Sequence, residues 1–113
     1  MITIKAVLDG AGLLKTCEIR GHAGAGKRGS DIVCSAVSVL AKTALMTLSG
    51  REGISVRGGP GERGSFSLET EALTGGGREF LAATGAFLLN GLESVAGEYP
   101  QNCGVTILME RRD

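Results

Sequence analysis

The sequence predicts a single α+β domain of the α/β class, a two-layer sandwich with two helices on one face of a mixed, mostly antiparallel sheet. Three observations support this fold class. A chain of 113 residues suits one hydrophobic core. The apolar pattern gives the element order β-β-α-β-β-α-β. Hairpin-type connections dominate, and no linker or internal repeat divides the chain, so residues 1–113 are expected to form one domain.

The chain begins with a predicted β-hairpin. Residues 2–8 alternate apolar and other side chains, and the turn sequence DGAG follows them. Residues 13–21 alternate again through Leu13, Cys17 and Ile19, although Lys15 interrupts the apolar face near the turn. The two segments therefore indicate a pair of antiparallel strands.

A glycine-rich segment separates this hairpin from the first predicted helix. Ser30 and Asp31 are both residues that cap helix N-termini. Apolar residues at helical spacing follow, and Gly50 is expected to end the helix. They are Val33, Val37, Leu40, Ala44 and Leu48. This start places Cys34 in the first turn of the helix.

The second half of the chain predicts two short strands, a helix and a last strand. The strands are centred on residues 54–56 and 66–70, and the sequence GGPGERG between them predicts an irregular loop. The helix is expected from about Arg78 to Gly97, with TGGG before it and an apolar stripe along it. That stripe contains Phe80, Leu81, Phe87, Leu88, Leu92 and Val95. Gly85 and Gly91 are expected to permit close packing. The last strand is expected over residues 103–109.

Composition excludes several classes of partner. The chain has 12 basic and 12 acidic residues, and this balance argues against direct nucleic-acid or anionic-membrane binding. No apolar run reaches the roughly 18 residues that a membrane span requires. The N-terminal sequence MITIKAVL lacks the pattern of a secretion signal, so a cytoplasmic protein is expected.

The cysteines point away from a disulfide framework and from a metal site. An odd number of cysteines, Cys17, Cys34 and Cys103, fits a reducing compartment. The chain has one histidine and no CxxC pair, so neither a metal nor another cofactor is expected. By strand parity Cys17 and Cys103 belong to the core, whereas Cys34 stands at the boundary of an element.

The stretch GHAGAGKRGSDIVC, residues 21–34, allows two functional interpretations. The first is a phosphate-binding loop over Gly21–Gly29, because GAGKRG satisfies G-x-G-x-x-G and GHAGAGK satisfies the start of a P-loop. The context disfavours this interpretation. Arg28 stands where a P-loop has Ser or Thr, and the chain opens with a hairpin instead of a β-α-β unit.

The second interpretation is a thiol enzyme. A cysteine in the first turn of a helix is stabilised as thiolate, and His22, which follows the second strand, could activate it. Each residue also has a simpler structural explanation: Cys34 as a buried apolar residue, His22 as a surface group and Asp31 as a helix cap. Spacing in the sequence leaves these alternatives open.

Two segments resemble a known family. GHAGAGKRGSDIVCSAVSVL resembles the signature of the ribosomal-processing cysteine protease family Prp, and LLNGLESVAGEYPQNCGVTI matches it more loosely. The resemblance covers essentially the whole chain. It implies that His22 and Cys34 form a catalytic dyad and that Asp31 and Ser38 support it.

The same resemblance implies an activity and an assembly. It implies a homodimeric endopeptidase that removes an N-terminal extension from a large-subunit ribosomal protein. Gly24, Gly26 and Gly29 would then make a mobile loop over a thiol site. Residues 25 and 26 are Ala and Gly, whereas relatives often have bulkier residues there, which puts the loop's substrate contacts in doubt. A nucleotide-binding module and a non-catalytic ribosome-associated protein are the alternatives.

Overall fold

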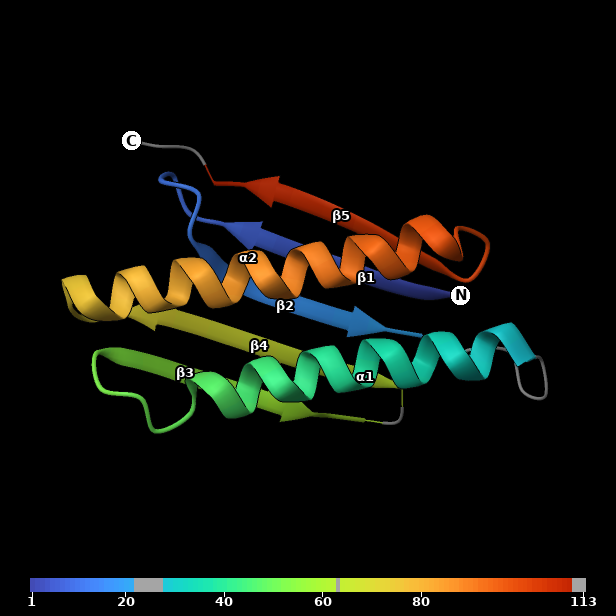
Figure 1. Cartoon of the computed structure of the whole chain (residues 1–113), viewed down its shortest axis with the longest axis horizontal. Helices are drawn as coiled ribbons and strands as arrows, with labels where there is room; N and C mark the ends of the chain where they lie inside the picture. The colour runs from blue at the N-terminus through green and yellow to red at the C-terminus, as the bar shows by residue number, and fades with distance from the viewer. Residues whose placement is uncertain (22–27, 63, 111–113) are drawn as a thin grey trace.

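A computed structural model of the chain describes residues 1–21, 28–62 and 64–110. Two helices lie side by side as one layer over one face of a five-stranded sheet (Figure 1). Along the chain the elements are β1 (Ile2–Leu8), β2 (Leu14–Arg20), α1 (Arg28–Leu48), β3 (Ile54–Pro60), β4 (Ser65–Ala72), α2 (Gly75–Glu98) and β5 (Cys103–Met109). The predicted fold class and element order are confirmed.

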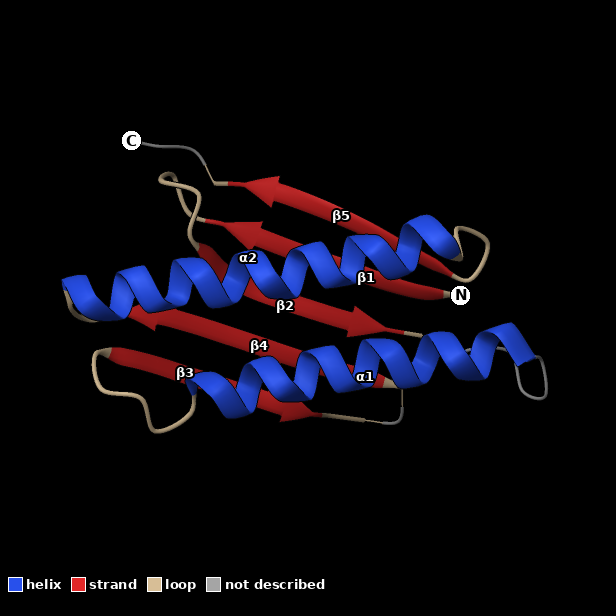
Figure 2. Ribbon diagram, viewed as in Figure 1, coloured by secondary structure: helices blue, strands red, loops and turns tan. Residues whose placement is uncertain are grey.

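The sheet is mixed, as the sequence predicts. Its strand order is β3-β4-β2-β1-β5 (Figure 2). β1 pairs in parallel with β5, while β1–β2, β2–β4 and β3–β4 are antiparallel. The parallel pair arises because α2 carries the chain from β4 back across the sheet to its far edge, and such a crossover is the usual connection to a parallel strand.

A β-bulge explains the interrupted pattern of the second strand. Val7 pairs with Thr16, whereas Leu8 pairs with Leu14, so Lys15 is an extra residue in β2. The bulge lets Leu14 and Cys17 both face the core although three positions separate them. Lys15 is directed outward instead, where its ammonium group forms a 2.8 Å ion pair with Glu110.

The core lies between the helical layer and one face of the sheet. Ile4, Leu68 and Cys17 contribute from the strands, and Val33 and Leu92 from the helices. Cys103 is also buried, so the predicted core positions of Cys17 and Cys103 are confirmed. The one buried polar residue among those described, Thr70, donates a 2.6 Å hydrogen bond to the carbonyl of Leu14, which satisfies its hydroxyl.

Two helices begin earlier than predicted. α1 starts at Arg28, so the prediction that Ser30 or Asp31 caps it is wrong: both lie inside the helix. α2 starts at Gly75, because the Thr74 side chain accepts a 3.0 Å hydrogen bond from the N–H of Gly77 and caps the helix there. The three glycines of TGGG are therefore helical in spite of their low intrinsic propensity.

The predicted loop GGPGERG is partly strand. β3 continues to Pro60, with Gly58 and Gly59 at φ values of 129° and 127°. A Cβ atom on Gly58 would collide with the carbonyl oxygen of Ser67, so the close pairing of β3 with β4 requires glycine at this position. β3 is an edge strand, which is where a sheet tolerates proline.

The apolar stripe of α2 is narrower than predicted. Leu81, Leu88 and Leu92 are buried, but the Phe87 side chain is 74% exposed. By length and composition alone α2 could cross a membrane; in the structure it packs on the sheet. The expected close packing at Gly85 and Gly91 is confirmed, because a Cβ atom added there would lie 3.1 Å from the Leu14 side chain and 2.8 Å from that of Leu40.

Candidate active site

Cys34 lies in the second turn of α1. It is the seventh residue of a helix that begins at Arg28, so its predicted position in the first turn is wrong. The backbone N–H of Cys34 therefore belongs to the helix interior, where each N–H donates to the carbonyl four residues earlier. The helix terminus is further from the sulfur than the sequence suggests, and the N–H of Cys34 is not a free donor for an oxyanion.

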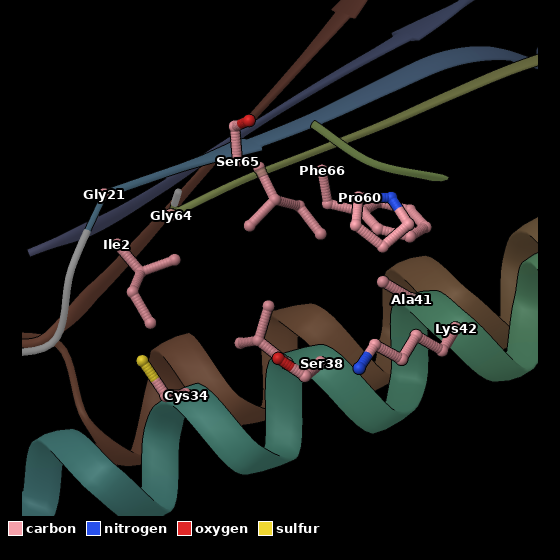
Figure 3. Close-up of a pocket in the computed structure, with 12 residues that line it drawn as sticks. Ile2, Gly21, Cys34, Ser38, Ala41, Lys42, Pro60, Gly64, Ser65 and Phe66 are labelled. Atoms are coloured by element: carbon pink, nitrogen blue, oxygen red, sulfur yellow. The ribbon is translucent and has the colours of Figure 1, made fainter. Parts of the chain in front are cut away.

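The partly buried thiol of Cys34 points from α1 into a cavity of about 230 Å³ between the helix and the sheet (Figure 3). The cavity is lined by Ile2, Ile19, Gly21, Cys34, Val37, Ser38, Ala41, Lys42, Pro60, Gly64, Ser65 and Phe66. Drug-sized ligand pockets usually exceed about 300 Å³. This cavity therefore suits part of a longer chain better than a whole cofactor.

Ser38 lines the same cavity one helical turn beyond Cys34. Residues four apart on a helix share one face, so the structure brings together the two side chains that the sequence paired on α1. Lys42, one further turn along, also lines the cavity. Lys42 was not predicted as a site residue: its spacing puts it on the same helix face as Cys34 and Ser38, but spacing alone does not show what that face meets.

Gly21 forms the other border of the cavity, at the end of β2. Its N–H donates a 2.9 Å hydrogen bond to the carbonyl of Gly64. Its φ is 111°, and a Cβ atom would collide with the carbonyl oxygen of Met1, so glycine is required here. These constraints fix the point where the chain leaves the sheet, directly beside the cavity.

Several predicted site residues lie outside this description. His22, Gly24 and Gly26 fall outside the described residues. Gly29 and Asp31 lie in α1, and the described side chains of that helix begin after Asp31. The pairing of His22 with Cys34, the role of Asp31 and the mobility of the glycine loop therefore stay predictions.

Burial separates the other two thiols from Cys34. Desolvation raises the pKa of Cys17 to about 11, and burial also raises the pKa of Cys103. Both therefore stay protonated and unreactive at neutral pH. All three cysteines are free thiols, and of the three Cys34 is the one with access to a cavity.

The described residues hold no group of three or more His, Cys, Asp or Glu side chains that could bind a metal ion. The chemistry that this site offers is that of a thiol. Its described features are a partly exposed sulfur, a hydroxyl one helical turn away and a mostly apolar cavity.

Comparison with known proteins identifies the family. The family model described as "Cysteine protease Prp" matches residues 1–104. The chain therefore belongs to the cysteine protease Prp family and is a cysteine protease. A search of the curated proteins gave no match.

Solved structures share the fold over nearly the whole chain. SMU.848 from Streptococcus mutans is 26% identical with a TM-score of 0.80, and the alignment covers 97% of this chain and 96% of that one. The essential ribosomal processing protease Prp from Staphylococcus aureus, in complex with a substrate peptide, is 19% identical with a TM-score of 0.79, covering 95% and 99%. The same S. aureus protease with a covalently linked product peptide is 20% identical with a TM-score of 0.77, covering 97% and 100%.

Proposed function

We propose that the protein is a cysteine endopeptidase that removes an N-terminal extension from a large-subunit ribosomal protein, with Cys34 as nucleophile and His22 as general base. One observation carries the assignment of residues: the sulfur of Cys34 faces a cavity that Gly21 also lines, and His22 follows Gly21 in the sequence. The peptide complexes of the S. aureus ribosomal processing protease support a peptide as the ligand.

The mechanism follows from the chemistry of the pair. His22 accepts the proton of Cys34, and the thiolate attacks the scissile carbonyl carbon. The C–N bond then breaks as His22 returns the proton to the leaving amine, and water hydrolyses the thioester. In this scheme Ser38, one helical turn beyond Cys34, donates a hydrogen bond to the sulfur or to the oxyanion. Asp31 orients His22 in this scheme. The remaining oxyanion donors come from outside the interior of α1.

The proposal also covers the location, the oligomeric state and the cofactor requirement of the enzyme. The enzyme works in the cytoplasm as a homodimer, without bound nucleic acid or membrane. It needs no cofactor, because a thiolate paired with an imidazole supplies both nucleophile and proton carrier. The two alternatives, nucleotide binding by residues 21–29 and a non-catalytic ribosome-associated role, gain no support from a family of proteases.

A cleavage assay tests the proposal. The purified protein is incubated with a synthetic peptide of its host's own ribosomal N-terminus, and the products are identified by mass spectrometry. We expect one cut in the wild type and none in Cys34→Ala or His22→Ala. Ser38→Ala should slow the reaction, whereas Ser35→Ala, an exposed neighbour of Cys34 that does not line the cavity, should not.

Each other outcome has a definite meaning. A peptide that binds but is never cut would favour the non-catalytic alternative. Unchanged cleavage by Cys34→Ala would overturn the thiol mechanism. Nucleotide affinity that disappears in Lys27→Ala would restore the phosphate-loop interpretation.

A further inference from the structure

Lys42 is the charged residue of the cavity. Among the described residues that line it, no other carries a charge, and none is a carboxylate. The remaining lining is mostly apolar, with Pro60 and Phe66 on the sheet side opposite α1. Lys42 is exposed to solvent, so it acts as a hydrated, salt-screened charge beside the cavity, and its attraction for an anion is modest.

The ammonium group of Lys42 has no partner among the described side chains, which are those of residues 1–21, 32–62 and 64–110. The lysines and arginines that form ion pairs in this part of the chain are Lys15, Arg20 and Arg57. Lys42 makes neither an ion pair nor a hydrogen bond there. In Figure 3 its side chain runs back along α1 toward Ser38, the direction in which helical side chains lean. The charge is thus directed along the cavity toward Cys34.

We propose that Lys42 is a specificity-determining residue, which binds a side-chain carboxylate of the substrate peptide two to four residues from the scissile bond. This rests on the proposed function in taking Cys34 as the nucleophile and a peptide as the substrate. Eight residues along a helix correspond to about 12 Å, and the backward lean of the side chain shortens this separation. An extended peptide advances about 3.4 Å per residue, so a residue two to four positions away spans the gap.

Affinity labels of graded length test this inference without a known substrate. The labels are bromoacetyl-(Gly)n-Asp-amides with n from 0 to 4, each compared with its Asn counterpart. The sulfur of Cys34 displaces bromide, and mass spectrometry measures the labelling rate at this residue. In the wild type we expect the Asp label to react about three- to fivefold faster than the Asn label at the best spacing, and the advantage to shrink in high salt.

Variants assign the effect to one residue. The ratio should fall to about one in Lys42→Met, fall below one in Lys42→Glu and persist in Lys42→Arg. Lys5→Met is the matched control, because Lys5 is an exposed lysine of β1 that does not line the cavity. A ratio that is unchanged in Lys42→Met, or that never exceeds one in the wild type, would overturn the assignment.

The outcome can be separated from that of the cleavage assay. If the labels discriminate through Lys42 but no peptide is ever hydrolysed, the proposed protease activity fails and the carboxylate preference stands. If peptides are hydrolysed and acidic labels gain no advantage, the role of Lys42 fails alone. An absence of labelling at Cys34 by every compound would overturn both.

Discussion

At the scale of single residues, this protein places its three cysteines in two kinds of environment. Cys17 and Cys103 are 1% and 2% exposed and pack in the core, whereas Cys34 opens onto a cavity. Burial penalises the charged form of a thiol, so a buried cysteine serves as a small apolar residue. Cysteine therefore packs in the core at two positions and presents an accessible thiol at the third.

Alanine substitutions should separate these roles. Cys34→Ala should abolish cleavage and leave the free energy of unfolding nearly unchanged, because its side chain borders a cavity instead of filling the core. Cys17→Ala and Cys103→Ala should each lower the free energy of unfolding by about 1–2 kcal/mol and spare turnover, since each removes a buried sulfur. Urea unfolding and the cleavage assay measure the two effects. Activity that is lost in Cys17→Ala but kept in Cys34→Ala would reverse the assignment.

The raised pKa of Cys17 predicts a loss of stability at alkaline pH. Below pH 9 this thiol is protonated in both the folded and the unfolded chain, so it adds no pH dependence. Between pH 9 and about 11 the unfolded chain releases a proton that the folded chain keeps. The free energy of unfolding should therefore fall in this window by up to about 1.4 kcal/mol per pH unit, and Cys103 should add to the loss.

Urea titrations at pH 8, 9 and 10 measure this dependence, and Cys17→Ala supplies the control. The variant should be less stable than the wild type at pH 8 but should lose less stability as the pH rises. Equal slopes in the two proteins would show that Cys17 does not titrate differently in the folded and unfolded states.

Some residue-level features could be predicted from the sequence and others could not. The burial of Cys17 and Cys103 followed from alternation along a strand, which is a local pattern. Lys42 was missed because its relevance depends on β2 and β4 facing α1, and no spacing within α1 reveals what lies opposite. The exposure of Phe87 was missed for the same reason, since the helix stripe does not show how far the sheet extends beneath it.

At the scale of elements, glycine contacts determine how closely the helices approach their neighbours. Gly77 in the first turn of α2 lies against the carbonyl oxygen of Gly53, which also accepts a 2.7 Å hydrogen bond from the N–H of Leu73. A Cβ atom on Gly77 would collide with that oxygen. This contact joins the start of α2 to the turn before β3.

Gly77→Ala should consequently destabilise the fold by about 2 kcal/mol, because either the helix or the turn must move. Gly97→Ala, near the other end of the same helix, meets no atom within 4 Å and should stabilise by up to about 1 kcal/mol through helix propensity. Thermal and urea unfolding of both variants provide the comparison. Equal effects at the two positions would mean that propensity, and not the contact with Gly53, determines the outcome.

The element order was predictable because each strand and helix carries its own apolar period. The ends of elements were less predictable. α2 starts three residues before the predicted Arg78 because the Thr74 cap stabilises the helix start more than the low helix propensity of three glycines destabilises it. β3 runs through Gly58 and Gly59 because pairing with β4 stabilises their backbone conformation, which the isolated segment would not favour. A local cap decides the first case, and a tertiary contact decides the second.

At the scale of the whole molecule, the helical layer carries exposed apolar side chains around a groove. A groove of about 510 Å³ runs between α1 and α2. We call it the helix groove; it is lined by Val39, Leu40, Thr43, Ala44, Thr47, Phe80, Ala83, Thr84, Phe87 and Leu88. Phe87 is 74% exposed and Val39 is 64% exposed. Contact between such large apolar side chains and water is unfavourable, and clusters of them commonly mark interaction surfaces. We expect this surface to be the contact between two copies of the chain, in keeping with the homodimer that the family resemblance implies.

Sedimentation of the wild type at micromolar concentration should therefore give a dimer. Phe87→Lys should raise the dissociation constant of this dimer at least tenfold. The substitution places a charge in the lining of the helix groove, where a second copy would have to desolvate it. Leu73→Lys is the matched control: Leu73 is 60% exposed but does not line the helix groove, so this variant should dimerise like the wild type. Circular dichroism should show the same helix content in all three proteins, because Phe87 contributes little to the core. A wild type that is monomeric at micromolar concentration would count against the dimer itself. A Phe87→Lys variant that dimerises normally would move the contact to another surface.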